Sequence, residues 1–328
     1  MATETLAPPA PRRLAEGPAP PGRVTDRVFR VVTLGAGLLV LVILGLIVVE
    51  TFGQARSWFS AEGLGSIFSA NWDPAKHHFG ALALVVGTLV VSFLALLIAV
   101  PVSVGLALFM TEVAPRRVRH YFVYTVDLLA AIPSVVFGLW AIYVLFQPLA
   151  DVYSSISSAT AGIPLLDTLF GSASKSGQAI MTAGIVVGIM ITPIVTSITR
   201  EVFATCPASQ KEAALALGAT RWEMIRGSVF PHSRSGVVSA VMIGFGRAVG
   251  ETIAVALVVG SNQRLTARIF GTGDTMASII ANEFGDATGT WRSALIGLGL
   301  VLLVLTVVIG IIARSVLGRA ERRLGAVG

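Results

Sequence analysis

The sequence predicts an all-α integral membrane protein with six transmembrane helices. Of its 328 residues, 54% are hydrophobic and only 13% are charged, about half the charged share of a typical soluble domain. Folded around one soluble core, such a chain would expose large apolar patches. Its apolar residues instead gather in six runs of about 20 residues or more, the length that crosses a bilayer. The single cysteine, Cys206, excludes an intrachain disulfide.

The six expected spans follow a leader. Residues 1–27, rich in proline and alanine, are expected to form a disordered cytoplasmic leader. The first span is too long for the apolar region of a signal peptide and lacks a small-residue cleavage site, so we expect it to be retained. The spans are 29–50, 80–110, 121–146, 178–200, 236–260 and 293–315.

Prolines interrupt three of these spans. Pro101, Pro133 and Pro193 lie within the second, third and fourth spans and predict kinks there. Kinks that serve helix packing are the simpler interpretation, and flexure along a pathway is the alternative.

The basic residues predict the orientation. With six spans, seventeen Lys and Arg residues fall on the side of both termini and six on the other. The positive-inside rule therefore places both termini in the cytoplasm. The net charge of +6 is scattered over short loops and tails, a distribution that does not favour nucleic-acid binding.

Two outer loops carry apolar side chains. Aromatic residues in 51–79 suit an interfacial belt; they are Trp58, Phe59, Phe68 and Trp72. Apolar residues in 275–285 follow helical spacing; they are Met276, Ile279, Ile280 and Phe284. We expect a short helix on the outer surface or docked on the bundle, and we favour an interfacial anchor over a partner-binding role.

The cytoplasmic segment 207–231, PASQKEAALALGATRWEMIRGSVFP, predicts two short helices. Ser209 followed by Glu212 forms a capping box at the first helix start, and Gly218 suits the position just after that helix. Thr220 with Glu223 forms a second capping box. The helix that it opens is expected to stop before Pro231.

The stretch GFGRAVGET at 244–252 places two charges inside the fifth expected span. Arg247 lies 11 residues from the cytoplasmic end of that span at Gly236, or about 16 Å along a helix, close to mid-membrane. Glu251 follows one turn later. A charge at this depth costs a few kcal/mol on insertion scales, so it needs a reason.

Three interpretations of these charges compete. Arg247 and Glu251 form an i,i+4 pair that neutralises itself, in the less favourable order. Alternatively they bind Asp127 of the third span, the only other deeply placed charge. As a third possibility they line an aqueous route for an anion, with Arg247 attracting it and Glu251 preventing it from sticking. Gly246 and Gly250 would also let another helix approach closely. From the residues alone, a role of these charges in helix packing and a role in an anion pathway are about equally favoured.

Several enzymatic and cofactor-binding motifs are missing. The chain has no Walker A sequence, so we expect it not to hydrolyse ATP itself. The glycines around Arg247 have the wrong spacing for a dinucleotide site, and no strand precedes them. Four scattered histidines and one cysteine make a poor metal site.

The run EAALALG followed by SVFP resembles the EAA loop of ABC-importer permeases, whose coupling helix docks on the ATPase subunit. The matching positions are Glu212, Ala213, Ala214, Gly218 and Pro231. The family usually carries an aliphatic residue where Ser228 stands and leucine at Phe230. For Glu212, helix capping alone is an alternative to direct contact with the partner.

The run GRAVGETIAVALVVG and the segment SNQRLTARIFGTGDTMASIIANEFGDA resemble the permease subunit of the bacterial phosphate ABC importer, PstC type. With AIPSVVFGLW and PVSVGLALFMTEVAP, the likeness runs from about residue 25 to the C-terminus. It implies a type I importer permease (MetI-like) core of five helices plus an N-terminal helix. It also implies that Arg247 and Glu251 take part in phosphate passage.

This resemblance divides the chain and implies partners. Residues 28–78 would form the first helix and outer loop, 79–317 the permease domain, and 318–328 a cytoplasmic tail. The partners would be a PstA-type permease, two cytoplasmic ATPase subunits and an extracytoplasmic phosphate-binding protein. ATP and Mg²⁺ would bind only the ATPases, with no cofactor on this chain. Phosphate would cross by alternating access.

Other functions remain open at this point. A permease for another oxyanion, such as sulfate or molybdate, would carry the same coupling segment. An ion-coupled transporter or anion channel is disfavoured because six spans show no evident inverted duplication. A membrane-embedded enzyme lacks a catalytic constellation.

Overall fold

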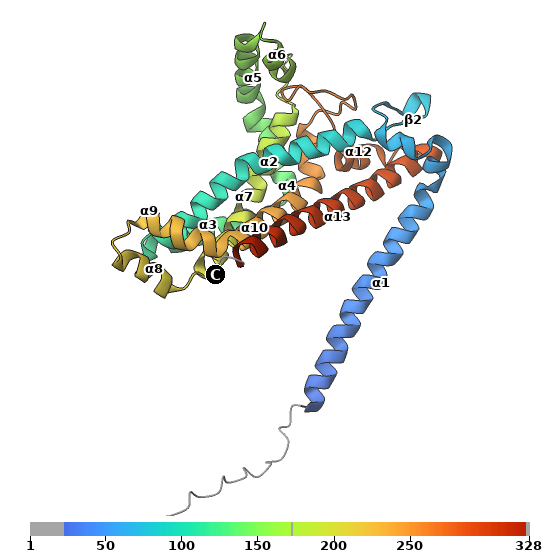
Figure 1. Cartoon of the computed structure of the whole chain (residues 1–328). Helices are drawn as coiled ribbons and strands as arrows, with labels where there is room; N and C mark the ends of the chain where they lie inside the picture. Colours follow the sequence, from blue (N-terminus) through green and yellow to red (C-terminus); the bar gives the residue numbers. More distant parts are fainter. Residues whose placement is uncertain (1–22, 172, 326–328) are drawn as a thin grey trace, which may run out of the picture. The chain divides into compact units, whose positions relative to one another are not determined.

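The computed structural model describes residues 23–171 and 173–325. The chain divides into two compact units, one ending at Glu50 and one beginning at Thr51. Most of the expected disordered leader, residues 1–22, lies outside the described part, and its remainder, 23–27, is helical, so the expectation is wrong for those residues. The described residues are almost entirely helical (Figure 1). Their one sheet is an antiparallel pair, β1 (Trp72–Asp73) with β2 (His78–Phe79), in which Trp72 faces Phe79.

The first unit contains most of helix α1 (Arg23–Glu62). This 40-residue helix includes the expected span 29–50 and continues past it. Its apolar stretch has a mean hydropathy of 2.9. At 1.5 Å per residue the helix measures about 60 Å, twice the hydrocarbon thickness.

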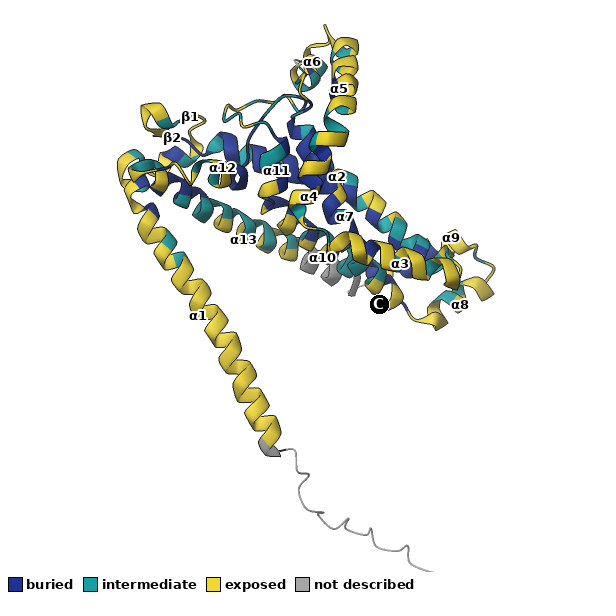
Figure 2. Cartoon of the chain, turned by 180° about the vertical axis from the view of Figure 1, so that it is seen from behind, coloured by how far each residue is buried: buried dark blue, intermediate teal, exposed yellow. Residues whose placement is uncertain are grey.

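Five described helices are long and apolar enough to cross a membrane. They cover Thr25–Glu62, Leu82–Val113, Ser134–Thr160, Ile180–Ala204 and Gly289–Ser315. The centre of the second unit is the pair α2 (Leu82–Leu108) and α7 (Ile180–Ala204), which each hold more buried residues than any other described helix (Figure 2). Gly184 and Gly188 of α7 meet Leu94 and Ala95 of α2, where a side chain would clash. Close packing of small residues is how membrane helices associate.

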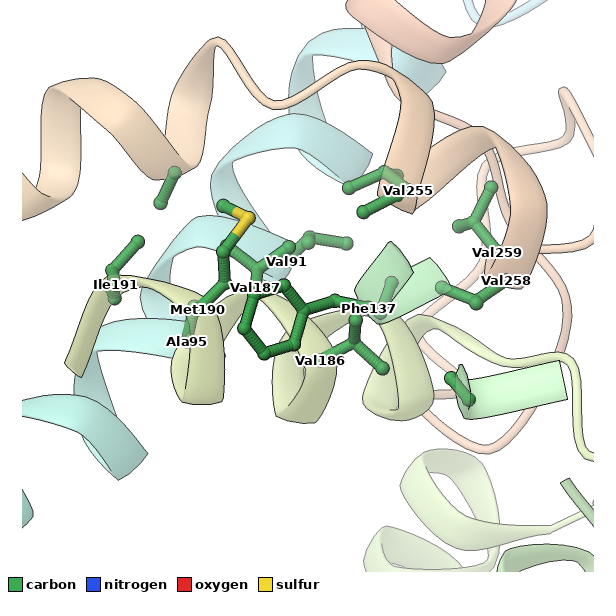
Figure 3. Packing of buried hydrophobic residues seen from close by; sticks show 14 of the residues in the cluster. Val91, Ala95, Phe137, Val186, Val187, Met190, Ile191, Val255, Val258 and Val259 are labelled. Carbon is green, nitrogen blue, oxygen red and sulfur yellow. The ribbon is translucent and has the colours of Figure 1, made fainter. Parts of the chain in front are cut away.

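The main apolar cluster joins these two helices to two shorter ones (Figure 3). Phe137 comes from α4 (Ser134–Trp140) and Val255 from α11 (Ile253–Val258), and both belong to the same buried cluster as Val187 and Met190 of α7. Pro101 and Pro193 stay inside continuous helices.

The expected third span is interrupted. Helix α3 (Arg116–Ala130) ends, and α4 begins only after Pro133. Proline lacks an N–H and disfavours helical geometry at the residue before it, so the chain leaves the helix at Ile132. The long apolar helix runs instead from α4 through the π-helix η4 (Ala141–Leu145) into α5 (Phe146–Thr160).

The expected fifth span is also not one helix. Helix α10 (Phe230–Val249) ends at Gly250, and α11 starts at Ile253. Helix α11 packs on α4 because Gly138 has no side chain. A Cβ there would lie 2.7 Å from Leu257 Cδ1.

Three π-helical turns each precede a proline by two or three residues. They are η3 (Phe109–Val113) before Pro115, η4 before Pro148, and η5 (Ile225–Val229) before Pro231. In η5 the N–H of Phe230 bonds the carbonyl of Ile225, five residues back. This widened turn shifts the hydrogen-bond register just where proline cannot donate. The expectation that the helix ends before Pro231 is therefore wrong, because α10 begins with Pro231 in its first turn.

The predicted aromatic belt is wrong for two of its four residues. Trp58 and Trp72 are buried in a cluster with Phe79 and residues of three other helices, α2, α12 (Met276–Glu283) and α13 (Gly289–Gly325). Trp58 lies on Gly297 of α13, where a Cβ would approach the indole to 2.2 Å. Phe68 is the exposed member.

The short helix predicted at 275–285 is present, and of its two predicted placements, docking on the bundle is confirmed. Helix α12 is docked on the bundle, with Met276 and Ile279 fully buried against Leu295 and Leu298 of α13. The segment also contacts α2 tightly. Gly87 lies so close to the Asp274 carbonyl that a Cβ would meet it at 2.0 Å.

Candidate translocation site and coupling segment

Arg247 lies in the last turn of α10 and is exposed. Within the described residues its guanidinium forms no hydrogen bond or ion pair. Its position is favourable for the helix, because a cation near the C-terminus complements the helix dipole. The structure thus leaves this charge open on the surface of the chain.

Glu251 lies just beyond the end of that helix and is buried, with 9% of its surface exposed. Its Oε1 accepts a hydrogen bond from the Ala254 N–H at 3.3 Å, at the start of α11. The i,i+4 pair with Arg247 is not formed, because the helix that would align the two residues has ended.

The break at 250–252 has a local cause in its sequence. The N–H of Gly250 bonds the Gly246 carbonyl, and the N–H of Glu251 bonds the Ala248 carbonyl, which tightens the last turn. The Thr252 hydroxyl then donates to the Gly250 carbonyl at 3.1 Å. Glycine and a side chain that bonds the local backbone both favour leaving a helix.

Asp127 is exposed on α3 and forms no ion pair in the part of the chain that the structure describes. The second interpretation, in which Asp127 neutralises Arg247 within this chain, therefore has no geometric support here.

The glycines beside Arg247 are open as well. No atom outside its own helix backbone lies within 4 Å of a Cβ built on Gly246. A groove of about 350 Å³ runs along this face between α10 and α13, lined by Met242, Gly246, Thr306 and Gly310 among others. The close helix approach that Gly246 and Gly250 permit is not used by a helix of this chain among the described residues.

The coupling segment, residues 207–231, begins with α8 (Ala208–Ala216). The expected capping box of Ser209 and Glu212 is wrong: Pro207 is the N-cap, no side chain caps the helix, and Ser209 lies inside the first turn. Gly218 has φ +88°, as predicted for the residue that ends the helix. Glu212 and Ala213 are exposed.

The second capping box is present. Thr220 Oγ1 accepts from the Glu223 N–H at 3.3 Å, and Glu223 Oε2 accepts from the Thr220 N–H at 2.8 Å. This bond lowers the pKa of the Glu223 carboxyl. Helix α9 (Arg221–Met224) thus starts where the sequence predicts.

One side of the coupling segment is anchored and the other is free. Ala214, Met224 and Ile225 pack on a cluster with Phe203 of α7 and Val229. The apolar side chains of Leu217 and Trp222 are 90% and 61% exposed. Exposed apolar residues next to a charged one are suited to contact another protein.

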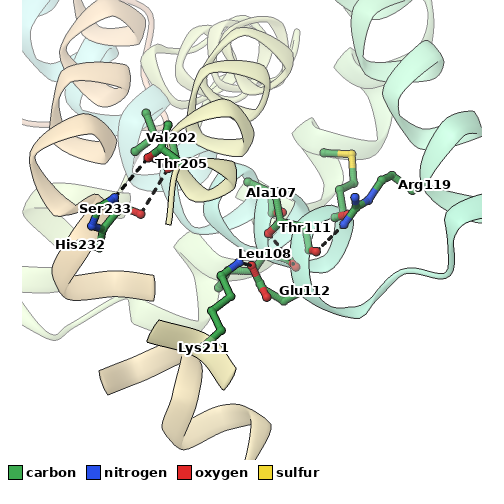
Figure 4. Close-up of polar contacts among 11 residues, drawn as sticks. Ala107, Leu108, Thr111, Glu112, Arg119, Val202, Thr205, Lys211, His232 and Ser233 are labelled. Carbon is green, nitrogen blue, oxygen red and sulfur yellow. Dashed lines mark hydrogen bonds and ion pairs between the residues drawn. The ribbon is translucent and has the colours of Figure 1, made fainter. Parts of the chain in front are cut away.

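An ion pair that the sequence analysis missed ties this segment to α2 (Figure 4). Lys211 Nζ lies 2.5 Å from Glu112 Oε1 in η3, and Glu112 is 8% exposed. Beside it, the Arg119 guanidinium donates to the carbonyls of Met110 and Thr111 at the end of the same helix. The two charges are 99 residues apart, so no sequence spacing could have paired them.

Similarity to known proteins shows the family to which this chain belongs. Residues 103–325 match the model of the family described as binding-protein-dependent transport system inner membrane component. The chain belongs to this family. As a permease it is a non-catalytic component of an ABC transporter.

The relatives of this permease carry consistent names. It is 41% identical to the phosphate transport system permease protein PstC of Mesorhizobium japonicum, over 92% of this chain and 93% of that one. It is 41% identical to the phosphate transport system permease protein PstC 2 of Mycobacterium tuberculosis, over 97% and 98%. A probable phosphate transport system permease protein PstC from Methanocaldococcus jannaschii is 34% identical, over 87% and 91%.

A solved structure of the bacterial alginate ABC transporter, in complex with an alginate pentasaccharide-bound periplasmic protein, shares the fold of this permease. Its TM-score is 0.59 at 18% identity, covering 89% of this chain and 96% of the other. The predicted importer-permease fold is therefore confirmed.

Proposed function

We propose that this chain is a transmembrane permease subunit of an ATP-driven importer that moves inorganic phosphate into the cytoplasm. The observation that supports it most is Arg247. This guanidinium is exposed and unpaired on an open face of α10, beside a helix break, in a chain whose relatives are named phosphate permeases.

The chemistry of phosphate fits this arrangement. Phosphate carries one to two negative charges at neutral pH, and moving it uncompensated through a low-dielectric region is prohibitive. A guanidinium holds two of its oxygens through parallel hydrogen bonds. Glu251, held at the start of α11, keeps a carboxylate next to that site and limits how tightly the anion is retained, since transport requires release.

The open face also supports an assembly. A PstA-type permease covering Gly246 and Arg247 would enclose the pathway between two subunits, where neither chain alone surrounds it. Two cytoplasmic ATPases that hold ATP and Mg²⁺ would dock on the coupling segment. An extracytoplasmic phosphate-binding protein would deliver the anion to the opposite side. In this arrangement both termini are cytoplasmic and this chain needs no cofactor of its own.

The test is uptake of radiolabelled phosphate by the assembled importer in proteoliposomes. We expect Arg247→Gln to reduce uptake by at least about tenfold, because a charge-assisted bidentate contact is lost. Arg234→Gln, which removes an exposed arginine from the same helix, should leave uptake unchanged. Both complexes should elute intact in size-exclusion chromatography.

Normal phosphate uptake by Arg247→Gln would contradict the assignment of Arg247 to the phosphate pathway. Unlabelled sulfate and molybdate are added in parallel. If either anion inhibits the uptake of radiolabelled phosphate as strongly as unlabelled phosphate does, the assignment of phosphate as the substrate is wrong.

A further inference from the structure

A second cavity lies at the other end of the bundle from the coupling segment. Helix α2 and its continuation η3 connect the two ends: Glu112 of η3 bonds Lys211 of the coupling segment, whereas Gly87 of α2 abuts Asp274. The cavity measures about 310 Å³. It is lined by Ser174, Asn262, Thr266, Arg268, Gly271 and Thr272, so it joins the loop before α7 to the loop between α11 and α12.

The base of this cavity is firmly held. Phe270 is buried and stacks on Tyr153 with ring centroids 4.4 Å apart. Its carbonyl accepts from the Ser174 N–H at 3.0 Å, and the Gly271 carbonyl accepts from the Ile180 N–H at 3.0 Å. Backbone contacts of this kind pre-organise a site, which lowers the entropy lost on binding.

The side chains that line the cavity are donors. The Thr266 oxygen accepts from the Arg268 N–H at 3.1 Å, and the Thr272 oxygen accepts from Asn262 Nδ2 at 3.4 Å. The hydrogens of both hydroxyls therefore remain available to a ligand. The Arg268 guanidinium has no ion pair among the described residues, and Arg264 lines an adjoining cavity that shares Thr266.

No carboxylate lines this cavity among the described residues. Asp274 lines the adjoining cavity with Arg264, and Glu283 accepts from Gln263 Nε2, next to the lining residue Asn262. Glu283 accepts from the indole N–H groups of Trp72 and Trp291 at 3.3 and 3.0 Å. Asp274 accepts from the Thr275 N–H and from the Ser278 hydroxyl. A concave site with an unpaired guanidinium and free hydroxyls, and without carboxylates, suits an anion.

We propose that this cavity binds a small tetrahedral oxyanion, inorganic phosphate if the function proposed above holds, before the anion reaches Arg247. A short stretch of polypeptide links Arg247 to the residues that line this cavity. Helix α11 follows Glu251 and ends at Val258, and the next carbonyl, of Val259, accepts at 3.0 Å from the N–H of Gly273, the residue after Thr272 of the cavity lining. In this proposal the anion is held first at Arg268 and then at Arg247.

The experiment isolates this site from the first. The assembled importer carrying Arg247→Gln is placed in lipid nanodiscs without the phosphate-binding protein, and equilibrium binding of radiolabelled phosphate is measured. We expect saturable binding that Arg268→Gln weakens by about tenfold or more. Thr272→Val, which keeps the side-chain shape, should weaken binding severalfold, and Thr272→Ser should restore it.

The matched control is Arg292→Gln. Arg292 is an exposed arginine after α12 whose guanidinium lies 4.8 Å from the Phe284 ring centre, and its loss should not change phosphate binding. Absence of saturable binding in the Arg247→Gln importer, or affinity unchanged by both Arg268→Gln and Thr272→Val, would overturn the proposal. Neither result changes the uptake that we expect of Arg247→Gln, so the uptake experiment tests the proposed function independently of this binding experiment.

Discussion

At the scale of single residues, Asp274 is a buried carboxylate with one oxygen left without a hydrogen bond. The other oxygen accepts from the Thr275 N–H at 2.8 Å and from the Ser278 hydroxyl. Burial raises the pKa of this carboxyl to about 6. The folded chain therefore binds a proton that the unfolded chain releases near pH 4, and stability falls as pH rises from about 4 to 6.

Asp274→Asn is expected to stabilise the permease at high pH. Asparagine keeps an oxygen for Thr275 and Ser278 and removes the cost of a buried charge. A shift of about two pKa units corresponds to about 3 kcal/mol at most above pH 6. About half of that is already present at pH 5, so the advantage of the variant should grow by about 1 kcal/mol from pH 5 to pH 8.

Thermal unfolding of the purified protein at the two pH values measures this difference. The control is Asp286→Asn, which changes an exposed carboxylate shortly after α12. An advantage for Asp274→Asn that is constant or shrinks with rising pH would contradict a buried ionised carboxylate.

At the scale of elements, the pair of Lys211 with Glu112 joins the coupling segment to η3, the continuation of α2. A largely buried ion pair holds its partners in one geometry, and breaking it leaves an uncompensated charge. If ATPase motion reaches the spans through α8, this contact transmits part of it to α2.

Glu112→Gln is expected to uncouple the importer. ATP hydrolysis should persist while phosphate uptake falls, so that the ATP consumed per phosphate rises severalfold. Both rates are measured in the same proteoliposomes. Glu201→Gln, an exposed glutamate 3.8 Å from Arg200, serves as control and should change neither rate. An unchanged ratio in Glu112→Gln, or no recovery in the charge-reversed double variant Glu112→Lys with Lys211→Glu, would argue against this link.

Two of the expected spans are interrupted within the bundle. The interruptions before α4 and α11 place short helices against each other through Gly138. Helices broken inside a membrane bundle are tolerated where protein or a cavity surrounds them. Because the helix ends at 250–252, Glu251 bonds the N–H of Ala254 and does not pair with Arg247.

At the scale of the whole molecule, the exposed part of the coupling segment predicts where the ATPase binds. Glu212, Leu217 and Trp222 all lie exposed on α8 and α9 or at their junction. Glu212→Lys is expected to reduce the ATPase that co-purifies with the permease by at least about half, because it reverses a charge within that surface.

The measurement is a pull-down from membranes with the tagged permease, quantified against the amount of permease recovered. Glu201→Lys, also on the side of the chain that we predict to be cytoplasmic, is the charge-matched control. ATPase recovered at the wild-type ratio would show that Glu212 does not lie in the contact.

The sequence by itself determined the features that depend on local composition. Long apolar runs predict membrane helices, and the second capping box and Gly218 are found where the pattern places them. The resemblance to phosphate importer permeases is confirmed by the relatives. It rests on motifs that are continuous in the chain.

Only the tertiary structure decided what depends on residues distant in sequence. Lys211 meets Glu112, Trp58 is buried on Gly297, and Ser174 shares a cavity with Arg268. Hydropathy reports how apolar a run is, but not which neighbour covers it or whether a glycine or proline ends the helix within it. Those outcomes depend on packing between elements, and packing left Arg247 uncovered.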